Sequence, residues 1–131
     1  MPADENVAIM QRAYDAFNDA DIDTLTELFD EDVVWHLPGH SSMAKDYEGR
    51  DATLGYFGKI GQETDGTFQA ELQQLFAGDD GRVIGLQRST GKRDGKSLDV
   101  GNCIVFELKD GKVVDGREHF NDLHAWDEFW S

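Results

Sequence analysis

Four strand-like runs fill the second half of the chain, and this feature restricts the possible folds more than any other. The runs are rich in β-branched and aromatic residues and cover residues 67–76, 82–90, 98–108 and 112–120. Their connections contain an aspartate followed by a glycine, a pair that favours tight hairpins because glycine adopts positive φ at little cost. These pairs are Asp80-Gly81, Asp94-Gly95 and Asp110-Gly111. The sequence therefore predicts a meander of long antiparallel strands.

The first sixty residues show helical periodicity instead. Apolar side chains recur at helical spacing in residues 6–17 and again in residues 22–29. A third helix is predicted over residues 50–60, although Gly55 and Gly58 weaken it. Glycines on a helix also allow another backbone to approach closely, and we expect that role here.

Between the second and third helices, residues 33–35 favour a strand that must end at Pro38, because proline lacks the donor that a strand ladder needs. A loop is predicted over residues 39–49. The tail, residues 121–131, carries large apolar side chains at helical spacing, so we expect a short helix that covers a cavity mouth or packs on a second subunit.

The length of 131 residues suits one domain, residues 1–131, with its own apolar core. Its 27 acidic and 12 basic residues give a net charge of −15, which repels phosphate backbones and anionic lipid surfaces. We therefore expect neither a nucleic-acid partner nor a membrane partner. The N-terminus has no basic, apolar leader and the lone Cys103 cannot form an internal disulfide, so we expect a cytoplasmic location.

Five short segments, in their order and spacing, carry a family resemblance: Phe17–Asp23, Leu28–Val33, Trp35–Gly39, Tyr47–Ala52 and Asp110–Val114. They resemble the SnoaL-like branch of the superfamily that includes nuclear transport factor two and ketosteroid isomerase. The resemblance implies an α+β fold, a cone-shaped roll in which N-terminal helices pack on a curved antiparallel sheet. It also implies an internal pocket for a small-molecule ligand and a homodimer formed through the sheet.

The steroid isomerases of this fold use a tyrosine, an aspartate base and a protonated aspartic acid. The matching positions in this chain hold Ala13, Leu37 and Ile104, and none of these side chains can transfer a proton. Tyr14 follows Ala13, but one residue along a helix is a turn of about 100° onto another face. Steroid isomerase activity by that mechanism is therefore not expected.

Strand alternation extends the matching to a catalytic candidate. If Ile104 faces the pocket, as its matched position implies, then Asn102 and Phe106 face it too, together with Glu118 and Phe120 on the last strand. A carboxyl group among aromatic rings would have a raised pKa and could serve as a general acid or base. Alternatively, Glu118 pairs with an arginine or reaches solvent at the rim.

Arg88 and His40 are the other catalytic candidates. Arg88 either pairs with Glu118 inside the pocket or projects from the outer face of the sheet. Epoxide hydrolases of this fold use an aspartate–arginine–aspartate set, and Asp99, Arg88, Glu118 and Asp122 supply the residue types without a clear match of positions. His40 follows the first strand, where it would be a proton carrier at the cone mouth or a surface histidine.

The predicted substrate-binding residues are mostly apolar or aromatic. They are Trp35, Tyr14, Leu37, Phe57, Asn102, Ile104, Phe106 and Phe120. Of these, Trp35 would stack on a hydrophobic ligand or fill the core. His36 and His40 are four residues apart, but the intervening Pro38 excludes the helical geometry of a metal pair. No metal site and no cofactor are predicted.

Two classes of function remain open. The chain is either an enzyme that acts on a small, largely apolar molecule by acid–base chemistry, as an isomerase, cyclase or hydrolase, or a non-catalytic ligand-binding or dimerisation module. A closed pocket around a desolvated Glu118 would favour the enzyme. A cavity filled by side chains would favour the binding module.

Overall fold

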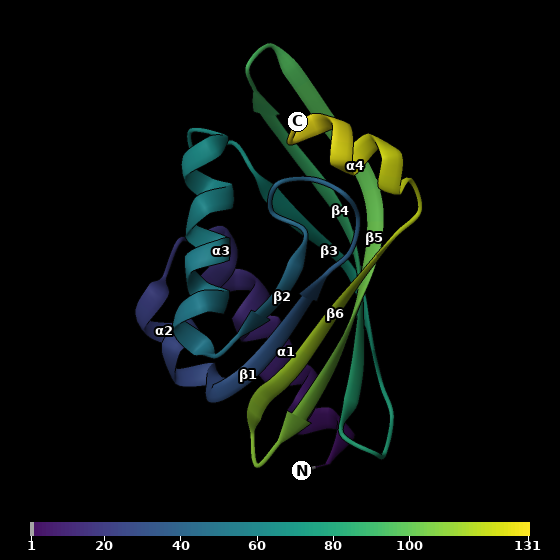
Figure 1. The fold of residues 1–131 in the computed structure, drawn as a ribbon. Coiled ribbons are helices and arrows are strands. Elements are labelled where there is room, and N and C mark those ends of the chain that lie inside the picture. Colours follow the sequence, from purple (N-terminus) through teal and green to yellow (C-terminus); the bar gives the residue numbers. More distant parts are fainter. Residues whose placement is uncertain (1) are drawn as a thin grey trace.

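The structure, a computed structural model, describes residues 2–131. Within them, four helices and six strands follow one another along the chain (Figure 1). Their order is α1 (Ala3–Asn18), α2 (Ile22–Leu28), β1 (Phe29–Leu37), β2 (Lys45–Glu48), α3 (Arg50–Glu63), β3 (Gln69–Ala77), β4 (Arg82–Arg93), β5 (Lys96–Lys109), β6 (Lys112–Phe120) and α4 (Leu123–Phe129).

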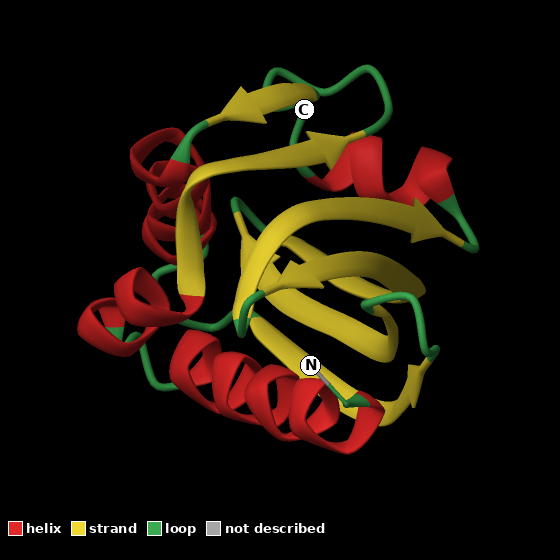
Figure 2. Cartoon of the chain, turned by 90° about the horizontal axis from the view of Figure 1, so that it is seen from below, coloured by secondary structure: helices red, strands yellow, loops and turns green. Residues whose placement is uncertain are grey.

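The six strands form one sheet in the order β2-β1-β6-β5-β4-β3. Neighbouring strands are antiparallel except β1 and β6, which run parallel, so the sheet is mixed and not antiparallel throughout as predicted. The sheet curls around the helices without closing, and α1 packs against β3 while α3 packs against β1 (Figure 2). This arrangement is the predicted α+β cone-shaped roll.

The predicted meander is confirmed, and β6 has the predicted bounds of residues 112–120. Asp94-Gly95 and Asp110-Gly111 have positive φ at both positions, as a tight hairpin turn requires. The loop predicted over residues 39–49 was wrong in one part, because it contains β2, which pairs with β1. A strand of four residues is too short to produce a readable alternation.

Local sequence explains how the shorter helices begin. Asp21 caps α2 by accepting a hydrogen bond from the backbone N–H of Thr24 at 3.1 Å, and Asp122 caps α4 by accepting from Ala125 at 3.0 Å. The role expected for Gly55 and Gly58 was wrong. A Cβ at either position would meet no atom within 4 Å, so no second backbone approaches α3 there.

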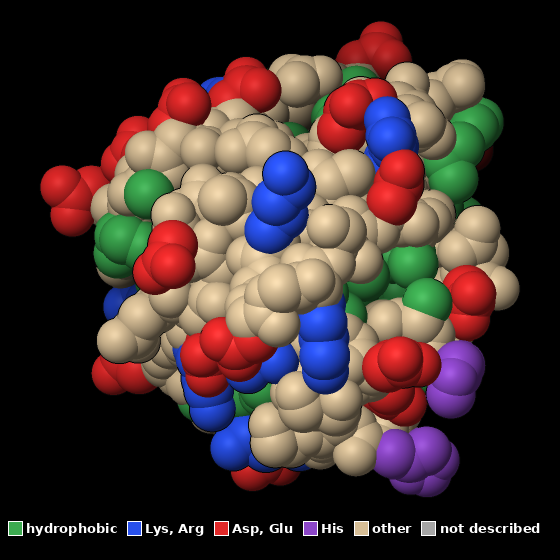
Figure 3. Space-filling model, turned by 90° about the horizontal axis from the view of Figure 1, so that it is seen from above, with side chains coloured by type: hydrophobic (Ala, Val, Ile, Leu, Met, Phe, Trp, Pro, Cys, Tyr) green, Lys and Arg blue, Asp and Glu red, His purple; other side chains and the backbone are tan. Residues whose placement is uncertain are grey.

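The tail is docked as predicted, since α4 buries Trp126 together with the neighbouring Phe129 and Trp130. The backbone N–H groups of His40 and Ser41 donate to Asp127 at 2.9 and 3.2 Å, and this ties α4 to the loop between β1 and β2. Acidic and basic side chains are both scattered over the face seen from above (Figure 3). No helix within residues 2–131 has the length and apolar character needed to cross a bilayer.

Candidate functional site

Glu118 lies on the inner face of the sheet with only 6% of its surface exposed. It pairs across the ladder with Ile104 of β5, and Asn102 and Phe106 on the same face are buried as well. The adjacent His119 is exposed on the opposite face. The alternation predicted for β5 and for this part of β6 is therefore confirmed, and the carboxyl group of Glu118 is inside the cone.

Three side chains donate hydrogen bonds to this carboxyl group. The indole N–H of Trp35 and the hydroxyl of Tyr56 both donate to Oε2, each at 2.9 Å. The amide of Asn102 donates to Oε1 at a longer distance of 3.5 Å. A carboxylate oxygen has two acceptor positions, so Oε2 is occupied while Oε1 keeps capacity for another partner.

No lysine, arginine or histidine of the described residues forms an ion pair with Glu118. Burial raises the pKa of Glu118 to about 7, although the hydrogen bonds from Trp35 and Tyr56 lower it. A carboxyl group with this pKa is partly ionised at neutral pH. It can therefore accept or release a proton under ordinary conditions.

A chain of buried hydrogen bonds runs from α1 across β4 and β5 to Glu118. Tyr14 Oη donates to Gln87 at 2.6 Å, Gln87 Nε2 donates to Ser89 at 3.0 Å, and Ser89 Oγ donates to Asn102 at 2.8 Å. Asn102 then donates to the carboxyl group. Every donor points the same way, so the dipoles of the chain favour negative charge at its end.

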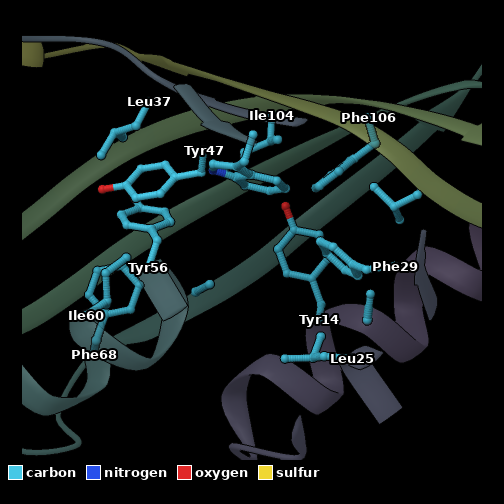
Figure 4. Close-up of a cluster of buried hydrophobic side chains, with 14 of the residues drawn as sticks. Tyr14, Leu25, Phe29, Leu37, Tyr47, Tyr56, Ile60, Phe68, Ile104 and Phe106 are labelled. Atoms are coloured by element: carbon cyan, nitrogen blue, oxygen red, sulfur yellow. The ribbon is translucent and has the colours of Figure 1, made fainter. Parts of the chain in front are cut away.

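Two glycines make room for this arrangement. Gly116 is the ladder partner of Trp35, and a Cβ there would overlap the indole ring. A Cβ at Gly85 would overlap the hydroxyl of Tyr14. The absence of a side chain on β6 and on β4 thus lets both aromatic side chains approach the strands closely. Figure 4 shows the Tyr14 hydroxyl pointing toward the strands.

A cavity of about 50 Å³ lies beside Glu118 and is walled mainly by apolar side chains of α1, α3 and the sheet. Several of these side chains, including Phe29 and Ile104, are labelled in Figure 4. It is small, since an engineered cavity that binds benzene has a volume of about 150 Å³. Five of the predicted substrate-binding residues line it: Trp35, Tyr14, Phe57, Ile104 and Phe106. Asn102 reaches the site through its hydrogen bond to Glu118.

Leu37 and Phe120 were also predicted to bind substrate, but they line a different hollow. It has a volume of about 320 Å³ and is also lined by His36, Arg117, Glu118 and His119, so Glu118 borders both hollows. Leu37 itself is buried and Phe120 is half-buried. Neither belongs to the wall of the smaller, apolar cavity, but both line the same hollow as Glu118.

The other two catalytic candidates lie away from the cavity. Arg88 is exposed on the outer face of β4, where its guanidinium donates to both oxygens of Asp99 at 2.8 and 2.6 Å. It does not pair with Glu118, because Gln87 and Ser89 hold the inward positions. With Asp122 capping α4, the hydrolase-like set is not assembled. His40 is exposed, as in the surface alternative, and it lines neither hollow.

His36 forms a separate polar cluster on the outer side of β1. Its Nδ1 contacts Asp46 of β2 and its Nε2 contacts Asp115 of β6, each at 2.8 Å. Burial alone would lower the pKa of His36, but the hydrogen bonds to the two carboxylates outweigh it and raise the pKa above its ordinary value. This cluster links three strands and makes no hydrogen bond with Glu118.

Sequence reasoning missed several residues that complete the site. Gln87 and Ser89 alternate with Arg88 along β4. The sequence did not decide which of these side chains faces the interior. Tyr56 precedes Ile60 by four residues, and this helical spacing was the available sign that it faces inward. Trp126 also lines the cavity; the helical spacing of the tail predicted its burial, but it was not among the predicted substrate-binding residues.

The chain is similar to known proteins in sequence and in fold. A model described as the SnoaL-like domain matches residues 10–116. The structure of Bal32a, from a soil-derived mobile gene cassette, is 57% identical with a TM-score of 0.97, and the match covers 98% of both chains.

Two more distant structures share the fold. An NTF2-like protein from Burkholderia xenovorans LB400 is 21% identical with a TM-score of 0.84, covering 100% of this chain and 99% of the other. TerC, co-crystallised with polyporic acid, is 18% identical with a TM-score of 0.82, covering 95% and 97%.

Proposed function

The chain belongs to the SnoaL-like domain family, and from this premise we propose that it binds a small, largely apolar molecule and acts on it by acid–base chemistry through Glu118. The observation that carries the proposal is a carboxyl group buried among aromatic rings, with a pKa of about 7. The similar fold of TerC, which was co-crystallised with a small organic molecule, supports the choice of ligand.

In this proposal Oε1 of Glu118 is the atom that exchanges a proton with the ligand. Oε2 is held by Trp35 and Tyr56, which fix the orientation of the carboxyl group. Oε1 has only the long contact with Asn102, so it keeps a free acceptor position. The apolar walls exclude water, and this keeps the carboxylate from being solvated and weakened as a base.

Entry of a ligand requires the cavity to widen. Phe17 of α1 and Phe57 of α3 both line the cavity, are half-buried and meet edge to face with their centroids 5.3 Å apart. Rotation of these two rings would enlarge the space without breaking a hydrogen bond. We therefore place the entrance between α1 and α3.

Proton abstraction next to a carbonyl group tests the proposal without knowledge of the natural substrate. The chain is incubated in D₂O with 1-indanone, and deuterium uptake at the carbon beside the carbonyl is followed by proton NMR. We expect exchange above the buffer rate, rising with pH through about 7 as Glu118 ionises. Glu118→Gln should reduce this exchange by roughly a hundredfold or more.

Glu71→Gln is the matched control, because Glu71 is exposed on β3 and lies outside the cavity. It should exchange at the unmodified rate. Exchange that is equal in Glu118→Gln and in the unmodified chain would reject Glu118 as the base.

The alternative is a non-catalytic ligand-binding or dimerisation module. The observation that favours it is the narrow cavity, whose volume of about 50 Å³ leaves little space beside a carboxyl group that already accepts three hydrogen bonds. Binding of 1-indanone without any exchange above the buffer rate would support this second function.

A further inference from the structure

Trp126 is a buried hydrogen-bond donor without an acceptor. Its side chain lines the cavity, its exposed fraction is 1%, and its indole N–H has no hydrogen-bond partner within residues 2–131. A buried indole N–H normally has a partner, because an unmade hydrogen bond in the interior costs stability. An unpaired indole N–H in a cavity wall therefore suggests that a bound ligand supplies its acceptor.

The other buried polar atoms without partners provide a comparison. In the part of the chain that the structure describes, these are Asn6 Oδ1, Arg93 Nε and Trp130 Nε1, and none of the three residues lines the cavity. Trp130 packs on Phe129 with ring centroids 4.7 Å apart and lies beside the guanidinium of Arg93 at 5.8 Å. Only Trp126 combines an unpaired donor with a place in the cavity wall.

Trp126 lies near Glu118 through its contact with Phe120. The indole ring of Trp126 stacks on Phe120 with centroids 4.4 Å apart. Phe120 lies two residues beyond Glu118 on β6, which is a step of roughly 7 Å along a strand. Trp126 and Glu118 both line the cavity, so a ligand inside it can contact both side chains.

We propose that Trp126 is a ligand-binding residue whose indole N–H donates a hydrogen bond to an oxygen acceptor of a compact, otherwise apolar ligand. The chemical class is a cyclic or aryl carbonyl compound, with its carbonyl oxygen at Trp126 and its ring between Trp126 and Glu118. This inference rests on the ligand site of the proposed function, but it does not require that Glu118 catalyse a reaction.

The test compares 1-indanone with indane, a hydrocarbon of similar shape that lacks the carbonyl oxygen. The chain has three tryptophans, so a ¹⁵N-labelled sample gives three indole N–H signals. On titration with 1-indanone, the signal of Trp126 should move downfield as its hydrogen bond forms, while the signal of Trp130 should not. Indane should produce no downfield shift. This measurement uses the unmodified chain and does not depend on the folding of any variant.

Two variants add a measure of affinity. Trp126→Phe keeps an aromatic ring but removes the donor, and it should weaken binding of 1-indanone about fivefold relative to indane, as expected for one neutral hydrogen bond. Trp130→Phe removes a comparable buried N–H outside the cavity and should leave this ratio unchanged. Equal loss for both probes in Trp126→Phe, an unmoved Trp126 signal, or no binding of 1-indanone would overturn the proposal.

The same samples separate this inference from the proposed function. If Glu118→Gln binds 1-indanone with a downfield Trp126 signal and the unmodified chain shows no deuterium exchange, the role of Trp126 stands and acid–base catalysis fails. If exchange is fast but Trp126→Phe does not change the affinity ratio, catalysis stands and the role of Trp126 fails.

Discussion

At the residue scale, the burial of Glu118 makes the stability of the folded chain depend on pH. Burial raises the pKa of this carboxyl group from an ordinary value of 4.5 to about 7. Between these values the folded chain holds a proton that the unfolded chain releases. Stability therefore falls as pH rises through this window, by about 3 kcal/mol once both states are fully ionised.

We expect Glu118→Gln to remove this pH dependence, because a glutamine cannot ionise. The free energy of unfolding of the variant, minus that of the unmodified chain, should be about 2.5 kcal/mol larger at pH 8 than at pH 5. Urea unfolding at the two pH values measures the difference. The cost of placing the new amide beside Asn102 does not depend on pH, so it cancels when the two values are subtracted. Glu71→Gln controls for the substitution itself. A difference that is the same at both pH values would show that Glu118 is not desolvated.

At the element scale, α3 has two different faces. Tyr56 and Ile60 are buried on the side that faces the sheet, and Tyr56 carries a hydrogen bond to Glu118. Gly55 and Gly58 are exposed on the other side, where a Cβ would meet no atom within 4 Å. These glycines lower the intrinsic stability of the helix and have no contact that compensates for it.

Gly55→Ala and Gly58→Ala should each stabilise the chain by about 1 kcal/mol, because alanine restricts the unfolded backbone and favours the helix. Urea unfolding measures the change. Gly85→Ala on β4 is the contrasting control, since its Cβ would overlap the Tyr14 hydroxyl and should destabilise the chain. A loss of stability in either α3 variant would indicate that another surface packs against those glycines.

At the scale of the whole molecule, the outer face of the sheet carries a group of exposed apolar side chains. Ile84 and Leu86 of β4 are 39% and 40% exposed, and Phe76 of β3, the ladder partner of Ile84, is 48% exposed. Val105 of β5 is the ladder partner of Ile84 on the other side and is half-buried. A continuous apolar surface of this kind is typical of an interface.

We predict a homodimer in which this outer face packs against its copy. Sedimentation at micromolar concentration should give about twice the mass of one chain. Leu86→Glu should shift the mass toward that of a monomer, because it places a charged group in an apolar interface. Ile22→Glu replaces a 47% exposed side chain on α2, away from the sheet, and should leave the mass unchanged. A monomeric unmodified chain would contradict the prediction.

The sequence by itself determined the features that depend on near neighbours. Alternation along a strand is a local property, and once the resemblance implied that Ile104 faces the pocket, alternation and the same matching placed Asn102 and Glu118 on the inner face. The Asp-Gly turns are local too, since their conformation depends on the φ preferences of two residues. The bounds of β6 and the docking of the tail followed from the same kind of pattern.

Only the tertiary structure decided how β4 is oriented and which side chains meet Glu118. On β4 the polar Gln87 and Ser89 face the interior while Leu86 faces solvent, which reverses the usual hydrophobic pattern. The reversal is tolerated because Tyr14 and residues of β5 supply hydrogen bonds to the buried polar groups, and those partners are distant in sequence. The approach of Tyr56 and Trp126 to the cavity has the same cause. It depends on how α3 and α4 pack on the sheet, and no local pattern specifies that packing.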